Sequence, residues 1–426
     1  MKFIIKTKKK SYTNQVKEIS KSLTTDDVME KGRAYPVGTI REWKGQKYIK
    51  TAQGWKPKSE GRKQGKKEDN TKTAATTDNK ISEIGDIVEF TTDKGNKIKG
   101  EVVAVGQDGV QVKNEGVIYK VKHENTEKVQ NKDGTIPASK FNANDYKKSF
   151  TDSNVTPDKA GVQYIYDKLG EEGKVAKEII EKKLKEQDER MEKLGGDTQK
   201  RNQVNGKYTP ERRELHEAII KEILSPEKER KAKPKNGEKP KYIIFGGRGG
   251  SGKSWFTDKK RAAQQGREVM FDSDNYITLD ADEIKKMLPE FEGWNAGEVH
   301  EESSDLMKEI KKIAMEKGLN IIVDGTMGYN PDKPDKVKNE VLEAKDKGYS
   351  TEAHYMFNPV QNSCVNAINR FKTKKGDWSG RLVPMPMLVS MQDNEKSFDS
   401  VKDIVDDWSF RDNQDFNAKV ISQKNK

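Results

Sequence analysis

The stretch GRGGSGKS, residues 247–254, has the residue types and spacing of a phosphate-binding loop, because it matches the pattern GxxxxGK[ST] in full. Its glycines let backbone N–H groups curl around a phosphate, and its lysine supplies a positive charge. The residues expected to hold the phosphates are Gly247, Gly249, Gly250, Ser251, Gly252, Lys253 and Ser254. Lys253 would neutralise the β- and γ-phosphates, and the Ser254 hydroxyl would ligate Mg²⁺. The motif predicts a site for a nucleoside triphosphate with Mg²⁺.

Two carboxylate-bearing segments follow this loop, each at the end of an apolar run. YITL leads into Asp280 and Asp282, and LNIIV leads into Asp324, with Thr326 just beyond it. Carboxylates at the carboxyl ends of parallel strands face the crevice in which ligands bind. Either Asp280 or Asp282 could there accept the proton of an attacking hydroxyl. The alternative is a helix N-cap with an acidic first turn, which Asp282 and Glu283 would satisfy, and the local pattern taken alone favours this alternative.

Two arginines further along the chain are candidates to clamp phosphoryl oxygens. Arg370 lies near the end of a predicted helix, and Arg381 follows a polar turn. Arginines after a phosphate-binding loop can stabilise the charge that develops during phosphoryl transfer. The alternative is that both are ordinary surface residues.

A parallel sheet is needed to bring these residues together. The apolar run KYIIF precedes the loop, and WFTDKKRAAQQ after it predicts a helix. Further strands are predicted at 276–280, 319–324 and 350–359, with amphipathic helices at 209–224 and 299–318. This alternation predicts an α/β fold in which helices flank a parallel sheet.

The composition divides the chain into four expected parts. Residues 1–80 form a basic segment with a small hairpin in Val37–Pro57, turning at Lys44-Gly45. Residues 81–128 hold four short β-type runs separated by glycine turns, which predicts a small SH3-like β-barrel. Residues 129–206 read as a linker and a helical arm, favouring a solvated helix or a short coiled coil. Residues 207–426 carry the phosphate-binding loop and its sheet.

Several classes of protein are excluded by composition. No apolar run is long enough to cross a membrane, so no membrane partner is expected. The single cysteine, Cys364, excludes an internal disulfide framework and fits a reducing compartment such as the cytoplasm. The four histidines lack metal-ligand spacing, and charged residues (36%) outnumber hydrophobic ones (31%), which predicts one core with long solvated segments.

The positive charge of the chain is concentrated at its start. Residues 1–80 carry 21 lysines and arginines against 9 acidic residues, so the whole formal excess of +12 lies there. Such a segment favours polyanions, and Trp43, Tyr48 and Trp55 among the lysines could stack on bases. The alternatives are a merely soluble basic tail and aromatic residues that pack on one another.

Taken together, these motifs resemble the zeta-toxin-like kinases over about half the chain, from Tyr208 to Asn413. The shared features, in family order, are YTPERRELHEAII, the phosphate-binding loop, LDADEIKKMLPEF, VHEESS, NIIVDGT, the arginine of NRF, and GRLVP. The resemblance implies a P-loop kinase fold that uses ATP and Mg²⁺ to phosphorylate the sugar of UDP-N-acetylglucosamine. It also implies an inhibitory antitoxin as a partner.

Carried over residue by residue, the resemblance gives each candidate a role. Asp282 becomes the general base, with Asp280 as the competing choice, and Lys253 and Ser254 handle the phosphates and Mg²⁺. The residues that would position the acceptor are Asp280, Asp324, Thr326 and Glu302, and the arginines that would embrace the phosphates are Arg370 and Arg381. The chain departs from the family where GT-x-R is frequent, because Gly328 stands at the place of the arginine. The acceptor is therefore open, while the kinase chemistry is kept.

The N-terminal half resembles, over the short motif in Val37–Pro57, modules of bacteriophage structural and polyvalent proteins. This implies a phage-encoded protein that acts in the host cytoplasm and is associated with the virion. Three functions follow as hypotheses. The first is phosphorylation of a nucleotide sugar or another small hydroxyl acceptor. The second is a polynucleotide or other nucleotide kinase, with nucleic acid delivered by residues 1–80. The third is a virion protein whose kinase domain is residual.

Overall fold

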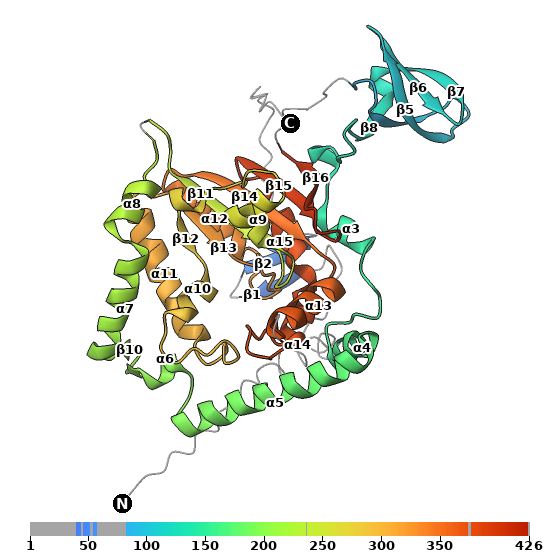
Figure 1. The fold of residues 1–426 in the computed structure, drawn as a ribbon. Helices are drawn as coiled ribbons and strands as arrows, with labels where there is room; N and C mark the ends of the chain where they lie inside the picture. Colours follow the sequence, from blue (N-terminus) through green and yellow to red (C-terminus); the bar gives the residue numbers. More distant parts are fainter. Residues whose placement is uncertain are drawn as a thin grey trace, which may run out of the picture. The chain divides into compact units, whose positions relative to one another are not determined.

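The computed structural model describes residues 82–235, 237–373 and 376–424, together with three strands between residues 40 and 57. The chain divides into two units, one of residues 21–80 and one that contains residues 81–426 (Figure 1). In the smaller unit the strands are β1 (Ile40–Trp43), β2 (Gln46–Thr51) and β3 (Gly54–Pro57). They pair antiparallel in the order β1-β2-β3, with Trp43 opposite Gln46. The predicted hairpin is confirmed, and a third strand extends it.

A second small sheet follows in residues 87–130. Its strands are β4 (Ile87–Thr91), β5 (Lys97–Val105), β6 (Gly109–Asn114), β7 (Val117–Lys122) and β8 (Thr126–Gln130). All are antiparallel to their neighbours in the order β7-β6-β5-β4-β8. Val88, Val102, Val110 and Val112 form its core. The four predicted strands are confirmed. A fifth strand, β8, crosses residue 128, the end of the expected range. Closure into an SH3-like barrel stays a prediction, because β7 and β8 stand at the two ends of the pairing order.

The candidate site depends on a six-stranded sheet. Its strands are β11 (Lys241–Gly246), β12 (Ile277–Leu279), β13 (Ile321–Asp324), β14 (Ser350–Phe357), β15 (Asp407–Asp412) and β16 (Lys419–Gln423). They lie in the order β12-β13-β11-β14-β15-β16, and all neighbours except β15 and β16 are parallel. The α/β fold and its parallel strands are therefore confirmed. The carboxyl ends of β12, β13, β11, β14 and β15 meet at one edge.

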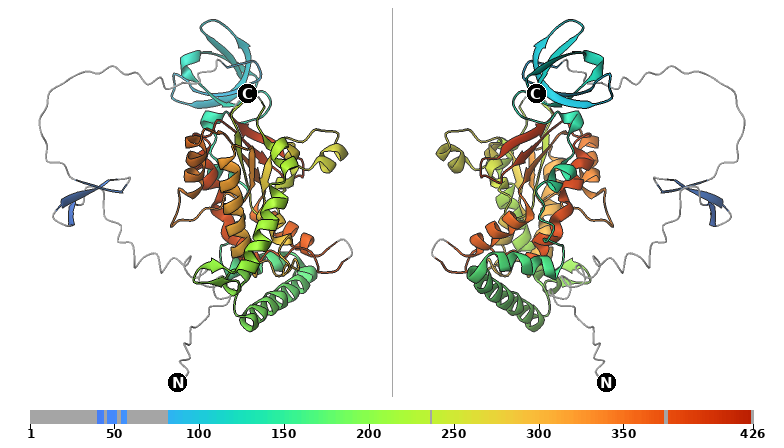
Figure 2. Two further views of the ribbon diagram at one scale, coloured as in Figure 1. Left: turned by 90° about the vertical axis from the view of Figure 1, so that its left-hand side faces the viewer. Right: turned by 90° about the vertical axis from the view of Figure 1, so that its right-hand side faces the viewer.

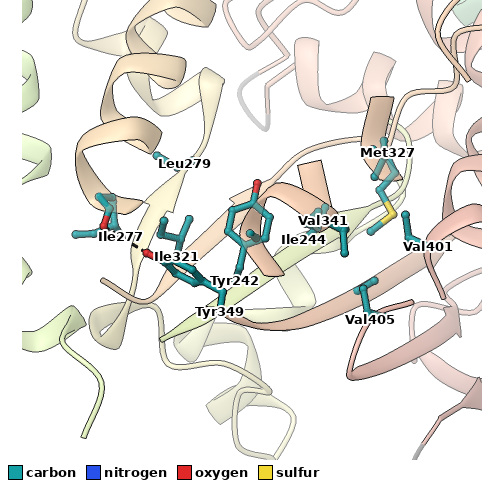
Figure 3. Close-up of a cluster of buried hydrophobic side chains, with 14 of the residues drawn as sticks. Tyr242, Ile244, Ile277, Leu279, Ile321, Met327, Val341, Tyr349, Val401 and Val405 are labelled. Atoms are coloured by element: carbon teal, nitrogen blue, oxygen red, sulfur yellow. Dashed lines mark hydrogen bonds between the residues drawn. The ribbon is translucent and has the colours of Figure 1, made fainter. Parts of the chain in front are cut away.

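The two faces of this sheet are covered unequally. The face of Tyr242 and Ile244 shares one buried cluster with residues of several helices, among them α3 (Ala143–Lys148), α11 (His300–Glu316), α12 (Lys336–Asp346) and α15 (Asn394–Val401). Figure 3 shows its core, where Ile277, Leu279 and Ile321 meet the two tyrosines Tyr242 and Tyr349. The face of Ile243 and Phe245 packs mainly on the segment after the phosphate-binding loop, through Phe256 and Phe271. Both faces are buried, which explains the continuous apolar run KYIIF.

The segment after the loop differs from the helix predicted for it. Residues Lys253–Phe256 form a single 3₁₀ turn, and α9 (Lys259–Gln264) begins only after Thr257. Asp258 caps α9 by accepting the Arg261 N–H at 2.9 Å. The continuous helix predicted here is wrong. An Asp in extended backbone restarts the helix, while Trp255 and Phe256 turn into the core on the way.

Residues 136–206 pack into the same body as the sheet. Phe141 and Ala143 belong to the main core, and the Tyr146 hydroxyl donates to Asp412 on β15 at 2.5 Å. Helices α4 (Lys159–Lys168) and α5 (Gly170–Leu194) bury Ile165, Tyr166, Ala176 and Ile180 against α13 (Val360–Phe371) and α14 (Met385–Ser390). Figures 1 and 2 show α4 and α5 beside these helices. The arm expected to be solvated is therefore packed along one side, with no break in packing at residue 207.

Six further helices and strands complete this body. They are α6 (Thr198–Arg201), β9 (Gln203–Val204), β10 (Lys207–Tyr208), α7 (Pro210–Ile223), α8 (Pro226–Ala232) and α10 (Ala281–Lys286). Thr209 caps α7, and Pro210 is its first residue. Among the described helices, none has the length and apolarity that crossing a bilayer would require.

We expect a chain shortened to residues 207–426 to be far less stable than one shortened to residues 131–426. The longer chain keeps Phe141, Ile165, Tyr166 and Ile180, and each large buried apolar side chain contributes about 1.5–3 kcal/mol. A domain is stable by only about 5–15 kcal/mol in total. Thermal unfolding followed by circular dichroism should give a cooperative transition at a clearly higher midpoint for the longer chain. Equal midpoints would contradict the packing described for residues 136–206.

Candidate active site

The phosphate-binding loop is held to the body by the buried arginine at its second position. Arg248 is 1% exposed, and one of its terminal nitrogens donates to both carboxylate oxygens of Glu395 at 2.8 and 2.9 Å. Its other donors reach the carbonyl oxygens of Asn358 and Met391 at 2.9 to 3.3 Å. Tyr355 donates a further hydrogen bond to Glu395 at 2.9 Å. Because the motif leaves this position open, the sequence did not indicate the anchor.

Two asparagines fasten the rest of the loop. Asn366 donates to the Gly250 carbonyl and Asn413 donates to the Ser251 carbonyl, both at 2.9 Å. Gly250 and Gly252 have positive φ angles of 86° and 96°. A Cβ on Gly250 would come within 2.3 Å of the Ser363 carbonyl oxygen, and one on Gly252 within 2.2 Å of the Asn413 amide. Glycine is required there by both backbone angle and close approach.

The fastened loop leaves donors free to hold an anion. Within the described residues, the backbone N–H groups of Gly250, Gly252 and Lys253 meet no acceptor, and the buried Ser251 hydroxyl has no hydrogen-bond partner. The Lys253 ammonium donates to the Gly247 carbonyl at 2.8 Å, and Ser254 is exposed. Burial lowers the pKa of Lys253, Asp324 raises it, and Arg381 and Arg370 lower it further. Backbone N–H groups that have no acceptor and lie beside a lysine are suited to bind the oxygens of a polyphosphate.

The two carboxylates at the strand ends lie close enough to affect each other. Asp280 follows β12, where it caps α10 by accepting the Asp282 N–H at 2.8 Å, and the predicted acidic first turn of Asp282 and Glu283 is confirmed. Burial, and then the negative charge of Asp324, raises the pKa of Asp280 to about 6. Asp324 closes β13, and burial raises its pKa as well, although Lys253 acts against this. A carboxylate with a raised pKa is suited to exchange protons near neutral pH.

Asp282 is held by one cation on each side. Arg381 forms an ion pair with its Oδ2 atom, and the Lys285 ammonium lies 3.3 Å from its Oδ1 atom. Lys285 is 6% exposed and sits one helical turn after Asp282 on α10. Burial lowers the pKa of Lys285, and Asp282 opposes this. Asp282 therefore lies in the first turn of α10 as a paired carboxylate, with its Oδ2 held by a partly exposed arginine.

A sharp turn after α13 brings the two arginines together. Gly380 donates its N–H to the Phe371 carbonyl at 3.0 Å, and a Cβ on Gly380 would meet the Arg370 carbonyl oxygen at 2.1 Å. This close return places Arg381 beside Arg370, which itself is exposed. The pKa of Arg370 is lowered by burial of its charged group and by Arg381, while Asp282, Asp280 and Asp324 raise it. The six charged candidates from the loop, both strand ends and this turn thus interact in one place.

The two remaining predicted acceptor residues, Glu302 and Thr326, lie in different surroundings from each other. Glu302 is fully buried on α11 and faces α7, where it accepts from Arg212 at 2.5 and 2.8 Å and contacts His216 at 2.6 Å. The expected role of Glu302 in holding substrate is corrected, because both of its oxygens are occupied in this internal ion-pair cluster. Thr326 lies at the site, where its carbonyl accepts from the Gly247 N–H at 3.3 Å and the Asn394 side chain at 3.0 Å.

Some residues of the site were missed from sequence. Lys285 could have been found, because a lysine three positions after Asp282 shares its helix face. Arg248, Asn366, Asn413 and Glu395 left no signal, since their partners are distant in sequence. In the part of the chain that the structure describes, no group of three His, Cys, Asp or Glu side chains could hold a metal. A Mg²⁺ ion would depend on Ser254 together with phosphate oxygens.

The fold and this loop define the class of P-loop α/β nucleotide-binding domains. More narrowly, residues 226–418, in the C-terminal half of the chain, match the zeta toxin family. Two curated proteins named Toxin zeta, from Enterococcus hirae and Streptococcus agalactiae, are 29% and 30% identical over 142 residues. That alignment covers 33% of this chain and 47% of each relative, so the chain spans about half the length of the curated relatives it matches.

Two solved structures are also similar in part. The PezAT chromosomal toxin–antitoxin system of Streptococcus pneumoniae gives 15% identity, with 51% of this chain and 83% of that chain covered and a TM-score of 0.36. The AvrRxo1-ORF1:-ORF2 structure with ATP gives 18% identity, with 49% and 65% covered and a TM-score of 0.37. At TM-scores below 0.5 neither likeness supports an inference about this chain.

We expect Arg248→Ala to destabilise the protein strongly. The substitution leaves the Glu395 carboxylate buried without a cation, and breaking such a pair costs about 3–5 kcal/mol. Urea unfolding measures the change in the free energy of unfolding. Arg230→Ala is the matched control, because Arg230 is exposed and its loss should change stability by less than about 0.5 kcal/mol. A similar small effect in both variants would contradict the anchoring role of Arg248.

We expect Asp280→Asn to stabilise the protein at neutral pH. An unfolded Asp titrates near pH 3.9, whereas Asp280 keeps its proton to about pH 6 in the folded protein. The folded state binds more protons between these values, so wild-type stability falls as pH rises from about 4 to 6. Asn keeps an oxygen for the Asp282 N–H without the charge. The gain should be about 1–3 kcal/mol at pH 7.5 and vanish near pH 4. An equal effect at both pH values in urea unfolding would contradict the raised pKa.

Proposed function

We propose that this protein is an ATP- and Mg²⁺-dependent phosphotransferase that transfers the γ-phosphoryl group to a hydroxyl of a nucleotide sugar such as UDP-N-acetylglucosamine. The observation that carries the proposal is the meeting of Lys253, Asp280, Asp282, Asp324, Arg370 and Arg381 beside a loop with unspent N–H groups. The family match and the relatives named Toxin zeta support it.

The residues of the site would each have a separate role in such a transfer. When bound, ATP supplies the phosphoryl group and Mg²⁺ neutralises its oxygens. Lys253 and the N–H groups of the loop hold the β- and γ-phosphates, while Arg370 and Arg381 face the charge that develops on the transferred group. Asp282 takes the proton of the acceptor hydroxyl as the new O–P bond forms and the bond from the γ-phosphorus to ADP breaks. Asp324 and Thr326 position the acceptor.

Asp282 must exchange a partner before it can act as the base. Its Oδ1 faces Lys285, which is buried on the same short helix, and its Oδ2 faces Arg381, which is 32% exposed on a loop. Because the loop side chain can turn toward solvent or a phosphate more easily than the buried lysine, the acceptor hydroxyl would take the place of Arg381 on Oδ2. Asp280 is the alternative base, and its pKa of about 6 would produce a loss of activity below that pH.

A second candidate is a polynucleotide or other nucleotide kinase. It is favoured by the excess positive charge of residues 1–80, which lie largely outside the described residues, and by the glycine at position 328. Gly328 is exposed, and a Cβ there would approach only the Thr326 hydroxyl at 3.4 Å, so the position has room for a larger side chain. Position 328 therefore carries no arginine, and the described residues leave the space beside it open.

The wider setting of the protein is proposed from its sequence and from the names of its relatives. We propose a phage-encoded protein that acts in the host cytoplasm, with residues 1–80 contacting nucleic acid or virion proteins. This rests on the charge of that segment and its short resemblance to phage modules. An inhibitory antitoxin is proposed because the relatives are named as toxins.

We expect the full-length chain to release ADP from ATP and Mg²⁺ when UDP-N-acetylglucosamine is added, with a phosphorylated sugar nucleotide visible by mass spectrometry. Asp282→Asn should lower the rate by about 10²–10⁴-fold, because it removes the proton acceptor. Glu283→Gln is the matched control, since Glu283 is the adjacent exposed carboxylate and pairs outward with Lys286. Asp280→Asn, assayed in parallel, decides between the two carboxylates.

The contrary outcomes are distinct. A rate that survives Asp282→Asn but not Asp280→Asn would move the base to Asp280. ADP release with an oligonucleotide, and none with the sugar nucleotide, would replace the acceptor by nucleic acid. The absence of acceptor-dependent turnover with either class would overturn the proposed function.

A further inference from the structure

The phosphate-binding loop lies between two unlike flanks of the sheet. On one flank, β13 and β12 end in Asp324 and Asp280, and these carboxylates interact with Lys253. On the other flank, β14 and β15 follow β11 in the sheet, and the loop after β15 contacts the phosphate-binding loop directly. Because Lys253 serves the β- and γ-phosphates, the γ end of a bound triphosphate faces the first flank. The nucleoside end must then extend toward the second.

The β15–β16 loop, defined as residues 413–418, is the element of the second flank that is fixed to the phosphate-binding loop. Asn413 donates its side-chain N–H to the Ser251 carbonyl at 2.9 Å and accepts the Ala418 N–H at 3.2 Å. Its backbone N–H is bonded to the Phe357 carbonyl at 3.0 Å, and the Phe416 N–H to the Asn413 carbonyl at 3.1 Å. The position of this loop is thus tied to that of the phosphate-binding loop.

Phe416, at the tip of this loop, is unusual in two ways. It is 59% exposed, and within the described ranges no other aromatic side chain is classed as exposed. Its φ angle is 58°, and Ala418 has a φ of 50°, both in the left-handed region that side chains other than glycine and asparagine rarely adopt. Residues held in such backbone conformations cluster at ligand sites, where surrounding contacts maintain them. An exposed ring on a tethered loop offers a free face.

The aromatic residue that is nearer in sequence cannot offer one. Trp255 directly follows Ser254, but the Arg267 guanidinium lies 3.9 Å from its ring centroid and that of Arg411 lies 4.6 Å from it. Arg267 also donates to the Trp255 carbonyl at 3.3 Å. Because two guanidinium groups lie on its ring, Trp255 stacks within the protein and offers no free face.

We propose that Phe416 is the surface on which the purine base of the nucleotide stacks. This inference rests on the proposed function, because it takes the phosphate-binding loop as the site of the triphosphate. Stacking of a base on an aromatic side chain contributes about 1–3 kcal/mol, which corresponds to about 5- to 150-fold in affinity. The residue therefore determines whether the site holds a nucleotide in preference to polyphosphate alone.

The test compares two probes on the full-length chain by isothermal titration calorimetry with Mg²⁺. The first probe is the β,γ-imido analogue of ATP, and the second is inorganic tripolyphosphate, which has no base. We expect Phe416→Ala to weaken binding of the ATP analogue by about 5- to 150-fold and to leave tripolyphosphate binding unchanged. Phe416→Trp should restore binding of the analogue. Leu342→Ala is the matched control, because Leu342 is an exposed apolar residue on α12.

Each other outcome has one meaning. If wild-type protein binds both probes and Phe416→Ala changes neither, the base lies elsewhere and the proposal for Phe416 fails while the phosphate site stands. If Phe416→Ala weakens both probes equally, the residue supports the loop and does not stack on the base, which also overturns the proposal. If wild-type protein binds neither probe, the proposed function fails, and the inference about Phe416 fails with it.

Discussion

The buried ion pair between Arg248 and Glu395 is the interaction on which the site depends. A phosphate-binding loop rich in glycine has little side-chain packing of its own, so its shape must come from the groups that hold it. Arg248 reaches through the body to Glu395 and to two carbonyl groups, and Tyr355 completes the hydrogen bonding of the carboxylate. Burying these charges is costly unless both are fully paired. Here every group has a partner, and the loop gains one fixed position.

The electrostatics of the site follow from that fixed position. Burial raises the pKa of both Asp280 and Asp324 at the ends of β12 and β13, and the charge of Asp324 raises that of Asp280 further. Lys253, Arg370 and Arg381 face them, and burial lowers the pKa of Lys253 and Arg370. Neither the carboxylates nor the cations would be stable in their charged forms at this place without the other set. Such an arrangement is preorganised for a reaction that moves negative charge from one oxygen to another, because the dipoles and charges need not reorient during the step.

Residues 136–206 complete the body that carries these charges. Helices α4 and α5 cover α13 and α14, and α13 leads directly to Arg370 and to the Gly380 turn. At its other end α5 contacts the segment before α11, where the Gln187 side chain accepts the Gly297 N–H at 3.0 Å and Arg190 pairs with Glu298 at 3.1 Å. One long helix therefore touches both the segment that brings the arginines and the segment that leads into α11.

Much of this could be predicted from the sequence, and the limit has a physical reason. The loop motif, the apolar strands and the position of Asp280 as a helix cap are local patterns, since each depends on residues within a few positions. The same locality misled at the helix after the loop and at α4 and α5, where charged faces favoured a solvated arm although Ile165 on α4 and Ala176 and Ile180 on α5 are buried. Tertiary structure alone decided that Glu302 lies buried with Arg212 and His216, and that Arg248 points away from the phosphates. The partners in those contacts lie 86 to 147 positions apart in the chain. No spacing rule connects such residues, because only the folding of the sheet and its helices brings them together.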